Sequence, residues 1–211
     1  MQKPATRIAT AASLAELVEL AGADDVLELH MEGVDLGEPV ALSKFDHQCC
    51  PPLAKQRGCE VLALTYCSLE AGSVHKLAAA LRHHTTLRRL FLRGNAIRSQ
   101  GAQLMAKALR GNDVLQVVEL DENGIGPDFP TGLLRALPSL LALNLYGNEI
   151  RELPQAIIDD PHATLEDLDL RANGLRQDAL PAKIPPRWML DGQRDHATIK
   201  KYRLKPRTTL Y

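Results

Sequence analysis

Large apolar side chains recur along the chain in a phrase that appears five times between residues 59 and 175. Each phrase has apolar residues at its first, fourth, sixth and eleventh positions, and an asparagine or cysteine at its ninth. Apolar residues two positions apart share one face of an extended chain, so each phrase predicts a short strand with one buried face. The ninth positions, which lie 28, 28, 25 and 25 residues apart, are Cys67, Asn95, Asn123, Asn148 and Asn173.

The repeated phrase resembles that of the leucine-rich repeat family, L-x-x-L-x-L-x-x-N/C-x-L at a period of 20–29 residues. The resemblance implies an α/β leucine-rich repeat solenoid, a short right-handed horseshoe with a parallel sheet on its concave side. One coil cannot bury its apolar face alone, so neighbouring coils stack and share a lengthwise core. We expect the asparagine amides to satisfy backbone groups in the turns, with Cys67 replacing one amide by a small thiol.

The segments between the strands predict helices in the first half of the solenoid and thin connections in the second. Alanine and leucine at helical spacing predict convex helices within residues 77–84 and 101–112. This wording is similar to the 28-residue, ribonuclease-inhibitor-type repeat. Pro130 indicates a shorter connection, and residues 153–157 and 180–184 have the Leu-Pro-x-x-Ile form of the shorter repeat class. We therefore expect the curvature to change near residue 125.

The first 58 residues depart from the repeat. Residues 11–21 place leucines on one helical face and predict an N-terminal capping helix. Leu27-x-Leu29-x-x-Glu32-x-Val34 keeps the strand rhythm without the asparagine and predicts a degenerate first coil. Residues 37–58 break the period and contain Pro51-Pro52, which have no N–H, so we expect an inserted convex loop rather than a regular helix.

The C-terminal end also departs from the repeat. Pro185-Pro186 stops it, and Trp188-Met189-Leu190 is expected to cover the last coil. The prediction is a single domain over residues 1–211. It comprises a cap helix, degenerate coil and inserted loop in 1–58, five clear repeats in 59–184, and a cap with a basic tail in 185–211.

The formal charge of −1 conceals an asymmetry between the tail and the rest of the chain. Residues 183–211 carry eight Lys or Arg and two Asp, a net charge of +6, which leaves −7 for the preceding part. Three interpretations stay open: a solvated tail, a tail that docks on an acidic partner, or a tail that contacts RNA or a membrane. Interspersed aromatic and apolar residues favour a segment that orders on a binding surface. The candidate contact residues are Lys200, Lys201, Arg203, Lys205 and Arg207.

Several classes of protein are disfavoured. The sequence has no apolar run of membrane-spanning length and no secretory signal with a hydrophobic centre. Cys59 and Cys67 occupy inward repeat positions, so we expect buried free thiols and an intracellular, cytoplasmic protein with no membrane partner. Residues 1–15 fit either a disordered lead or a mitochondrial-type presequence, since they carry basic and small residues without an acid.

No motif for catalysis or metal binding stands out. The phosphate-loop, nucleophile-elbow and zincin patterns are missing from the sequence. His47 with Cys49 and Cys50 makes a weak zinc candidate, because adjacent cysteines rarely both ligate one tetrahedral ion. His83 and His84 end the first convex helix, where a cationic side chain suits the dipole, and His84 aligns with Asn112 of the next coil. We predict no enzyme activity, no cofactor and no metal.

The repeat register places the residues that flank the inward leucines on the concave sheet. An exposed Phe91 beside Arg89 and Arg93, with Tyr146 two coils on, is similar to an interface anchor with a charged surround. The alternative is that Phe91 and Tyr146 only pack on neighbouring strand residues. Acidic residues in the later coils predict a partner with basic character. The candidate partner-binding residues are Arg89, Phe91, Arg93, Glu119, Asp121, Asn144, Tyr146, Asp169 and Arg171.

We therefore expect a non-enzymatic protein–protein interaction module, monomeric by itself, that binds a partner protein on its concave sheet. The alternative is a structural subunit of a large intracellular assembly, of ribonucleoprotein or ciliary type, held by its ends and its basic tail. A third hypothesis is the substrate-recognition part of a ubiquitin-ligase or signalling complex. Contact with nucleic acid is expected only through the tail.

Overall fold

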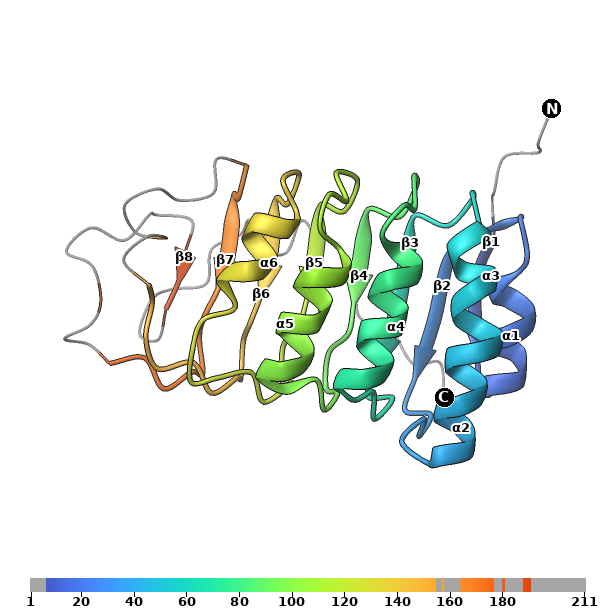
Figure 1. The fold of residues 1–211 in the computed structure, drawn as a ribbon, viewed down its shortest axis with the longest axis horizontal. Coiled ribbons are helices and arrows are strands. Elements are labelled where there is room, and N and C mark those ends of the chain that lie inside the picture. Colours follow the sequence, from blue (N-terminus) through green and yellow to red (C-terminus); the bar gives the residue numbers. More distant parts are fainter. Residues whose placement is uncertain (1–6, 155–156, 158–163, 177–179, 181–187, 191–211) are drawn as a thin grey trace, which may run out of the picture.

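The strands lie side by side in one parallel sheet and follow the order of the chain (Figure 1). The computed structural model describes residues 7–154, 157, 164–176, 180 and 188–190. The sheet has eight strands within these residues. They are β1 (Arg7–Ala11), β2 (Val26–Glu32), β3 (Val61–Thr65), β4 (Arg89–Phe91), β5 (Val117–Glu119), β6 (Ala142–Asn144), β7 (Asp167–Asp169) and β8 (Trp188–Met189).

Pairing between the strands places equivalent repeat positions next to each other. Leu62 pairs with Leu90, Leu90 with Val118, Val118 with Leu143, and Leu143 with Leu168. These side chains are buried and belong to the main core that runs through the coils. The solenoid architecture and the register of the five repeats are therefore confirmed.

The helices form a layer on one side of the sheet (Figure 1). Two full helices cover the first repeats and a short one follows, which confirms the predicted thinning after Asn123. Of the two Leu-Pro-x-x-Ile segments, residues 155–156 and 181–184 lie outside the described residues. The helices are α1 (Leu14–Ala21), α2 (Pro39–Lys44), the π-helical η1 (Phe45–Cys49), α3 (Cys50–Lys55), α4 (Ala71–Leu81), α5 (Arg98–Ala108) and α6 (Thr131–Ala136).

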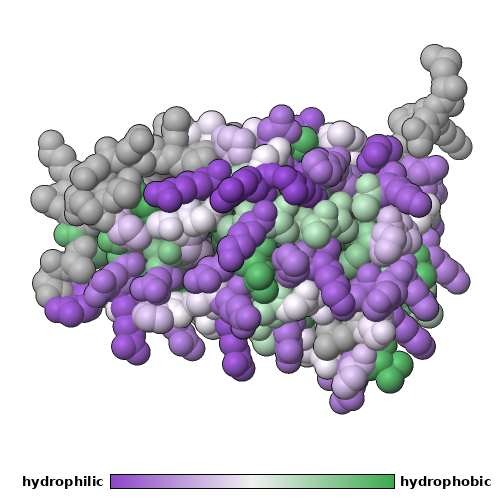
Figure 2. Space-filling view, viewed as in Figure 1, coloured by the Kyte–Doolittle hydropathy of each residue, from purple (hydrophilic) through white to green (hydrophobic). Residues whose placement is uncertain are grey.

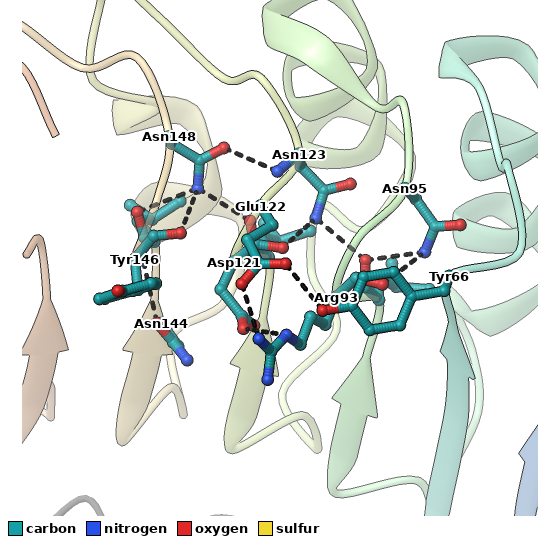
Figure 3. Close-up of polar contacts among 12 residues, drawn as sticks. Tyr66, Arg93, Asn95, Asp121, Glu122, Asn123, Asn144, Tyr146 and Asn148 are labelled. Carbon is teal, nitrogen blue, oxygen red and sulfur yellow. Dashed lines mark hydrogen bonds and ion pairs between the residues drawn. The ribbon is translucent and has the colours of Figure 1, made fainter. Parts of the chain in front are cut away.

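The asparagine ladder connects successive coils as the sequence predicts (Figure 3). Asn95 Nδ2 donates to the carbonyl oxygens of Leu64 and Leu92, both at 2.8 Å. Its Oδ1 accepts from the amides of Cys67 and Leu69, at 3.0 and 2.9 Å. Because the turn amides are buried between coils, these bonds replace the water that they lose.

The N-terminal coils differ from the prediction in two ways. Residues 7–11 form the edge strand β1, so this part of the expected disordered lead is ordered. In β2, Leu29 pairs with Leu62 and Met31 with Leu64, which moves the inward positions two residues along the chain from Leu27. The prediction was wrong because it aligned the first leucine pair, whereas Met31 fills the second inward position and Leu27 stays partly exposed.

The inserted segment is helical, which contradicts the expected loop. α2, η1 and α3 follow one another without a break, and Phe45, Cys49 and Leu53 are buried. Pro51 and Pro52 occupy the first turn of α3. A first turn has no intrahelical partner for its N–H groups, so proline is tolerated there. The preceding π-helical turn supplies the transition.

Residues 188–190 continue the sheet at its C-terminal end. Trp188 on β8 pairs with Leu168 on β7. Trp188, Met189 and Leu190 are all buried. Trp188 and Leu190 therefore repeat the inward pair of the earlier strands. Pro185, Pro186 and all of the candidate tail residues from 191 onwards lie outside the described residues.

The four cysteines are free and buried, as expected for Cys59 and Cys67. Burial raises the pKa of the Cys49, Cys50 and Cys59 thiols to about 12. It raises the pKa of Cys67 to about 11. These thiols are therefore protonated at neutral pH. Over the described part of the chain, no helix is long and apolar enough to cross a membrane.

His84 is buried and uncharged, which corrects the proposed cationic role. Burial, followed by the charge of Arg57, lowers its pKa from 6.5 to about 4. Its Nδ1 accepts the amide of Leu87 at 3.0 Å. In the next coil, Oδ1 of Asn112 accepts the amide of Leu115 at 3.0 Å, so the predicted alignment of these two residues is confirmed.

Candidate functional site

The face of the sheet opposite the helices is called here the concave face, and it carries the residues that alternate with the inward leucines. On β4 these are Arg89 and Phe91, followed by Arg93 beyond the strand. Phe91 pairs with Glu119 on β5, and Glu119 with Asn144 on β6. Asn144 pairs with Asp169 on β7. The structure therefore brings the predicted candidates onto one face of the sheet, where Phe91, Asp121, Asn144 and Asp169 are buried.

Phe91 is not the exposed anchor that the sequence analysis expected. It is 2% exposed and packs in a second apolar cluster, separate from the main core. Its neighbours in this cluster lie on the nearby strands β3, β5 and β6, which are contacts that the alternative interpretation expected. A linear register places a side chain on a face but does not show which neighbours bury it. This concave cluster consists of Val61, Ala63, Phe91, Val117 and Ala142.

A polar network beside the concave cluster is formed by Tyr66, Arg93, Asp121 and Glu122 (Figure 3). Arg93 Nη2 donates to Glu122 Oε1 at 2.6 Å, and its Nε lies 3.1 Å from Asp121 Oδ2. Its guanidinium lies 5.5 Å from the ring centroid of Tyr66. Tyr66 donates its hydroxyl to Glu122 Oε2 at 2.7 Å. Arg93, on the middle of three successive coils, thus connects an aromatic ring of the preceding coil to two carboxylates of the following coil.

The network holds its charges at neutral pH. The hydrogen bond from Tyr66, followed by that from Arg93, lowers the pKa of Glu122. The hydrogen bond to Glu122 raises the pKa of Arg93. Burial and the same carboxylate raise the pKa of Tyr66, so its hydroxyl keeps its proton. Tyr66 and Arg93 stay substantially exposed, with Tyr66 at 41% and the Arg93 side chain at 45%.

Tyr66 and Glu122 were not among the candidate residues, and their shared backbone conformation is evident only in the structure. Both have left-handed backbone, with φ of 52° and 56°, at the position before the asparagine or cysteine. Gly94 and Gly147 occupy the same position with φ of 66° and 65°. A non-glycine residue there costs about 1–2 kcal/mol. Such residues recur at functional sites because surrounding contacts hold them in place.

A second aromatic–arginine pair lies three coils further along. Arg171 is 5.8 Å from the ring centroid of Tyr146. It is also bidentate with Asp169, through Nε to Oδ1 at 3.0 Å and Nη2 to Oδ2 at 2.8 Å. Tyr146 is 36% exposed, whereas Asp169 is fully buried. The Tyr146 ring therefore presents an ordered aromatic surface, and Asp169 positions the arginine beside it.

A small depression lies on the concave face near these residues. The depression between β5 and β6 encloses about 10 Å³, which is at the limit for a single water. Ligand pockets enclose roughly 300–1,000 Å³. Within the described ranges, no group of three or more His, Cys, Asp or Glu side chains could hold a metal ion.

A larger groove lies on the helix side, between α5 and α6, and the sequence analysis did not anticipate it. It encloses about 480 Å³ and is lined by Ala102, Ala106, Phe129 and Gly132, with Lys107, Arg110 and Arg135 also among its lining residues. The space arises where α5 is followed by the shorter α6. Figure 2 shows this side of the molecule as mainly hydrophilic, with hydrophobic surface exposed in its middle.

Comparison with known sequences places the repeats beside leucine-rich repeat proteins. The family model described as a leucine-rich repeat matches residues 83–106, which include Asn95. Protein NLRC5 of Homo sapiens is 35% identical over 91 residues, covering 42% of this chain and 5% of that protein. The chain therefore corresponds to a small part of that relative.

Comparison with solved structures supports the fold alone, because all identities are low. Leiomodin-1 actin-binding site 2 has a TM-score of 0.52 at 19% identity, covering 62% of this chain and 77% of that chain. The tropomodulin C-terminal domain of Caenorhabditis elegans has a TM-score of 0.50 at 11% identity, covering 63% and 81%. Internalin C2 of Listeria monocytogenes has a TM-score of 0.51 at 17% identity, covering 86% and 76%.

Proposed function

Since the chain belongs to the leucine-rich repeat family, we propose that it is a non-enzymatic interaction module whose concave face holds a partner protein. The observation that carries this proposal is the set of two exposed tyrosines, Tyr66 and Tyr146, each paired with an arginine held by carboxylates on the concave face. Tyrosine and arginine are enriched among the residues that dominate binding energy at protein interfaces.

Preorganisation supports the proposal. Tyr66 is held by Gly94 beneath its ring and by its hydrogen bond to Glu122. Arg93 is held by two carboxylates, and Arg171 by Asp169. Ordering a long side chain on binding costs about 0.5–1.5 kcal/mol, and these side chains are ordered before a partner arrives.

Charge defines the chemistry of the partner. The section from β5 to β7 carries five acids, Glu119, Asp121, Glu122, Asp167 and Asp169, against Arg171 and the neighbouring Arg93. We therefore propose that the partner presents basic side chains to these strands and an apolar or aromatic surface to Tyr66 and Tyr146. Leiomodin-1 actin-binding site 2 supports the general use of this fold in protein binding.

The test is a double substitution, Tyr66→Ala with Tyr146→Ala. Proteins retained from native extract by the wild type are identified, and the affinity of the purified partner is measured by calorimetry. Removal of two interface tyrosines is expected to weaken binding at least 30-fold, at roughly 1 kcal/mol or more each. Val40→Ala is the matched control, because Val40 is exposed on α2. Equal affinities for the double variant and the wild type would refute the concave interface.

The second candidate function is a structural subunit held in a large assembly by its basic tail. The net charge of +6 in residues 183–211 supports it. Deletion of residues 191–211 separates the two functions. Loss of association would support the assembly role, whereas retained or stronger association would support concave binding.

A further inference from the structure

The concave cluster is buried although the described helices lie on the other side of the sheet (Figure 1). Phe91 is almost fully buried, and so is Met189, which lies on the concave face of the last described strand. An apolar sheet face reaches such burial when another element packs on it. The described part of the chain supplies no such element on this face.

The chemistry of the face specifies what would cover it. Apolar side chains of the concave cluster adjoin the acids of β5 to β7. Five acids, Glu119, Asp121, Glu122, Asp167 and Asp169, outnumber the two arginines that pair with some of them, Arg93 and Arg171, so this section of the face carries a net negative charge. The complementary element is therefore a basic segment with interspersed apolar side chains.

We propose that the basic tail of this chain, residues 191–211, is the element that occupies the concave face. The segment has six Lys or Arg and two Asp, and Tyr202 and Leu204 lie among its cations. Its positive charges meet the acids of β5 to β7, and its apolar residues meet the concave cluster. The acidic and basic parts of the chain are thus two halves of one intramolecular interface.

The length of the tail is sufficient for this contact. It starts after Leu190, at the β8 end of the sheet, and has 21 residues. An extended chain spans about 3.3 Å per residue, so the tail reaches up to about 70 Å. Strands lie about 4.8 Å apart, which places β1 about 34 Å from β8 and β5 about 14 Å away. Lys200, ten residues beyond Leu190, reaches β5 with chain to spare.

A spin label on the full chain tests the docking directly. The four native thiols are buried and protonated, so a nitroxide reagent should react selectively with a new cysteine at Thr208→Cys. Methyl NMR spectra then report which side chains lie near the label. We expect strong broadening of the methyl resonances of Val61, Ala63 and Val117, and none for Ala78 within α4.

Two matched variants examine the role of charge. Lys200→Glu with Lys201→Glu and Arg203→Glu in the tail should abolish the broadening. Glu119→Gln with Glu122→Gln on the face should reduce it at least twofold. Asp113→Asn is the control for the second variant, because Asp113 is an exposed acid after α5, away from the concave strands, and should have no effect.

Three outcomes would overturn the proposal. They are wild-type spectra without broadening on the concave face, broadening that survives reversal of the tail charges, and broadening that appears only between separate labelled and isotope-enriched molecules. The last would mean that the tail binds a second copy. Since no partner is present, failure here leaves the proposed function intact, and the double tyrosine variant tests that function separately.

Discussion

Replacement of His84 by asparagine should remove a defined part of the pH dependence of stability. The folded chain keeps His84 neutral, because its Nδ1 accepts the Leu87 amide inside the convex wall. A proton on Nδ1 would remove this bond and place a charge in the core beside Arg57. The unfolded chain has no such restriction, so protonation favours unfolding.

The size of the effect follows from the two pKa values. The pKa is about 4 in the folded chain against an ordinary value of 6.5. At about 1.4 kcal/mol per pKa unit, the titration of His84 lowers the free energy of unfolding by up to roughly 3 kcal/mol once the pH falls below both pKa values. The stabilisation is fully present above pH 6.5 and is lost progressively as the pH falls toward 4. Between pH 7.5 and 5.0 the expected loss is about 2 kcal/mol.

Asn112 shows why His84→Asn should retain the fold. Asn112 Oδ1 accepts the amides of Val114 and Leu115 at 3.0 Å, in the position that His84 occupies one coil earlier. Asparagine does not titrate, so the variant keeps the turn and loses the pH sensitivity. The adjacent His83→Asn is the matched control, because His83 is exposed.

Urea unfolding followed by far-ultraviolet circular dichroism, at pH 7.5 and 5.0, measures the difference. From pH 7.5 to 5.0, the free energy of unfolding of the wild type and of His83→Asn should each fall by about 2 kcal/mol more than that of His84→Asn. If the wild type and His84→Asn lost equal stability, the assignment of His84 as a buried neutral hydrogen-bond acceptor would be refuted.

Three further substitutions test the ladder, the core and the polar network. Leu120→Ala should cost ~2–5 kcal/mol as a fully buried truncation, and an unchanged thermal midpoint would contradict the register. Asn95→Ala should cost at least ~3 kcal/mol in urea unfolding, because it leaves buried backbone groups of two coils without partners; a loss below 1 kcal/mol would count against the ladder. Gly94→Ala places a Cβ 2.2 Å from the Tyr66 ring, so it should displace the ring. Gly111 also has left-handed backbone but has open space around it, so Gly94→Ala should lower the free energy of unfolding in urea more than Gly111→Ala does. Equal losses for the two variants would exclude the contact between Gly94 and the ring.

Most of the repeat architecture was accessible from the sequence because it is set by local periodicity. The leucine pairs specify which strand face is inward, and a one-residue slip would expose all of them. The asparagine positions specify the turns, and the change from 28 to 25 residues anticipated the shortening from α5 to α6. The register of the first coil was predicted wrongly because Met31, rather than a leucine, fills its second inward position.

The residues of the candidate site were only partly accessible. The register correctly placed Arg93, Tyr146 and Arg171 on the concave face. It could not show that Phe91 is buried or that Asp169 lies wholly inside, because burial depends on which other parts of the fold pack on the face. Large and small residues alternate in the sequence at Tyr66, Gly94, Glu122 and Gly147. Only the backbone angles show that these positions share a left-handed conformation.

The sequence alone was sufficient for the stacking of coils, because each phrase repeats one local rule and each coil meets only its neighbours. Tertiary structure decided everything that depends on distances between residues of different coils. In the tertiary structure, residues 39–55 are helical despite the prolines, and Tyr66 forms a hydrogen bond with Glu122, 56 residues away in the sequence. His84 is buried as a neutral hydrogen-bond acceptor. Periodicity specifies the direction of a side chain, whereas burial, charge state and contact arise from packing in three dimensions.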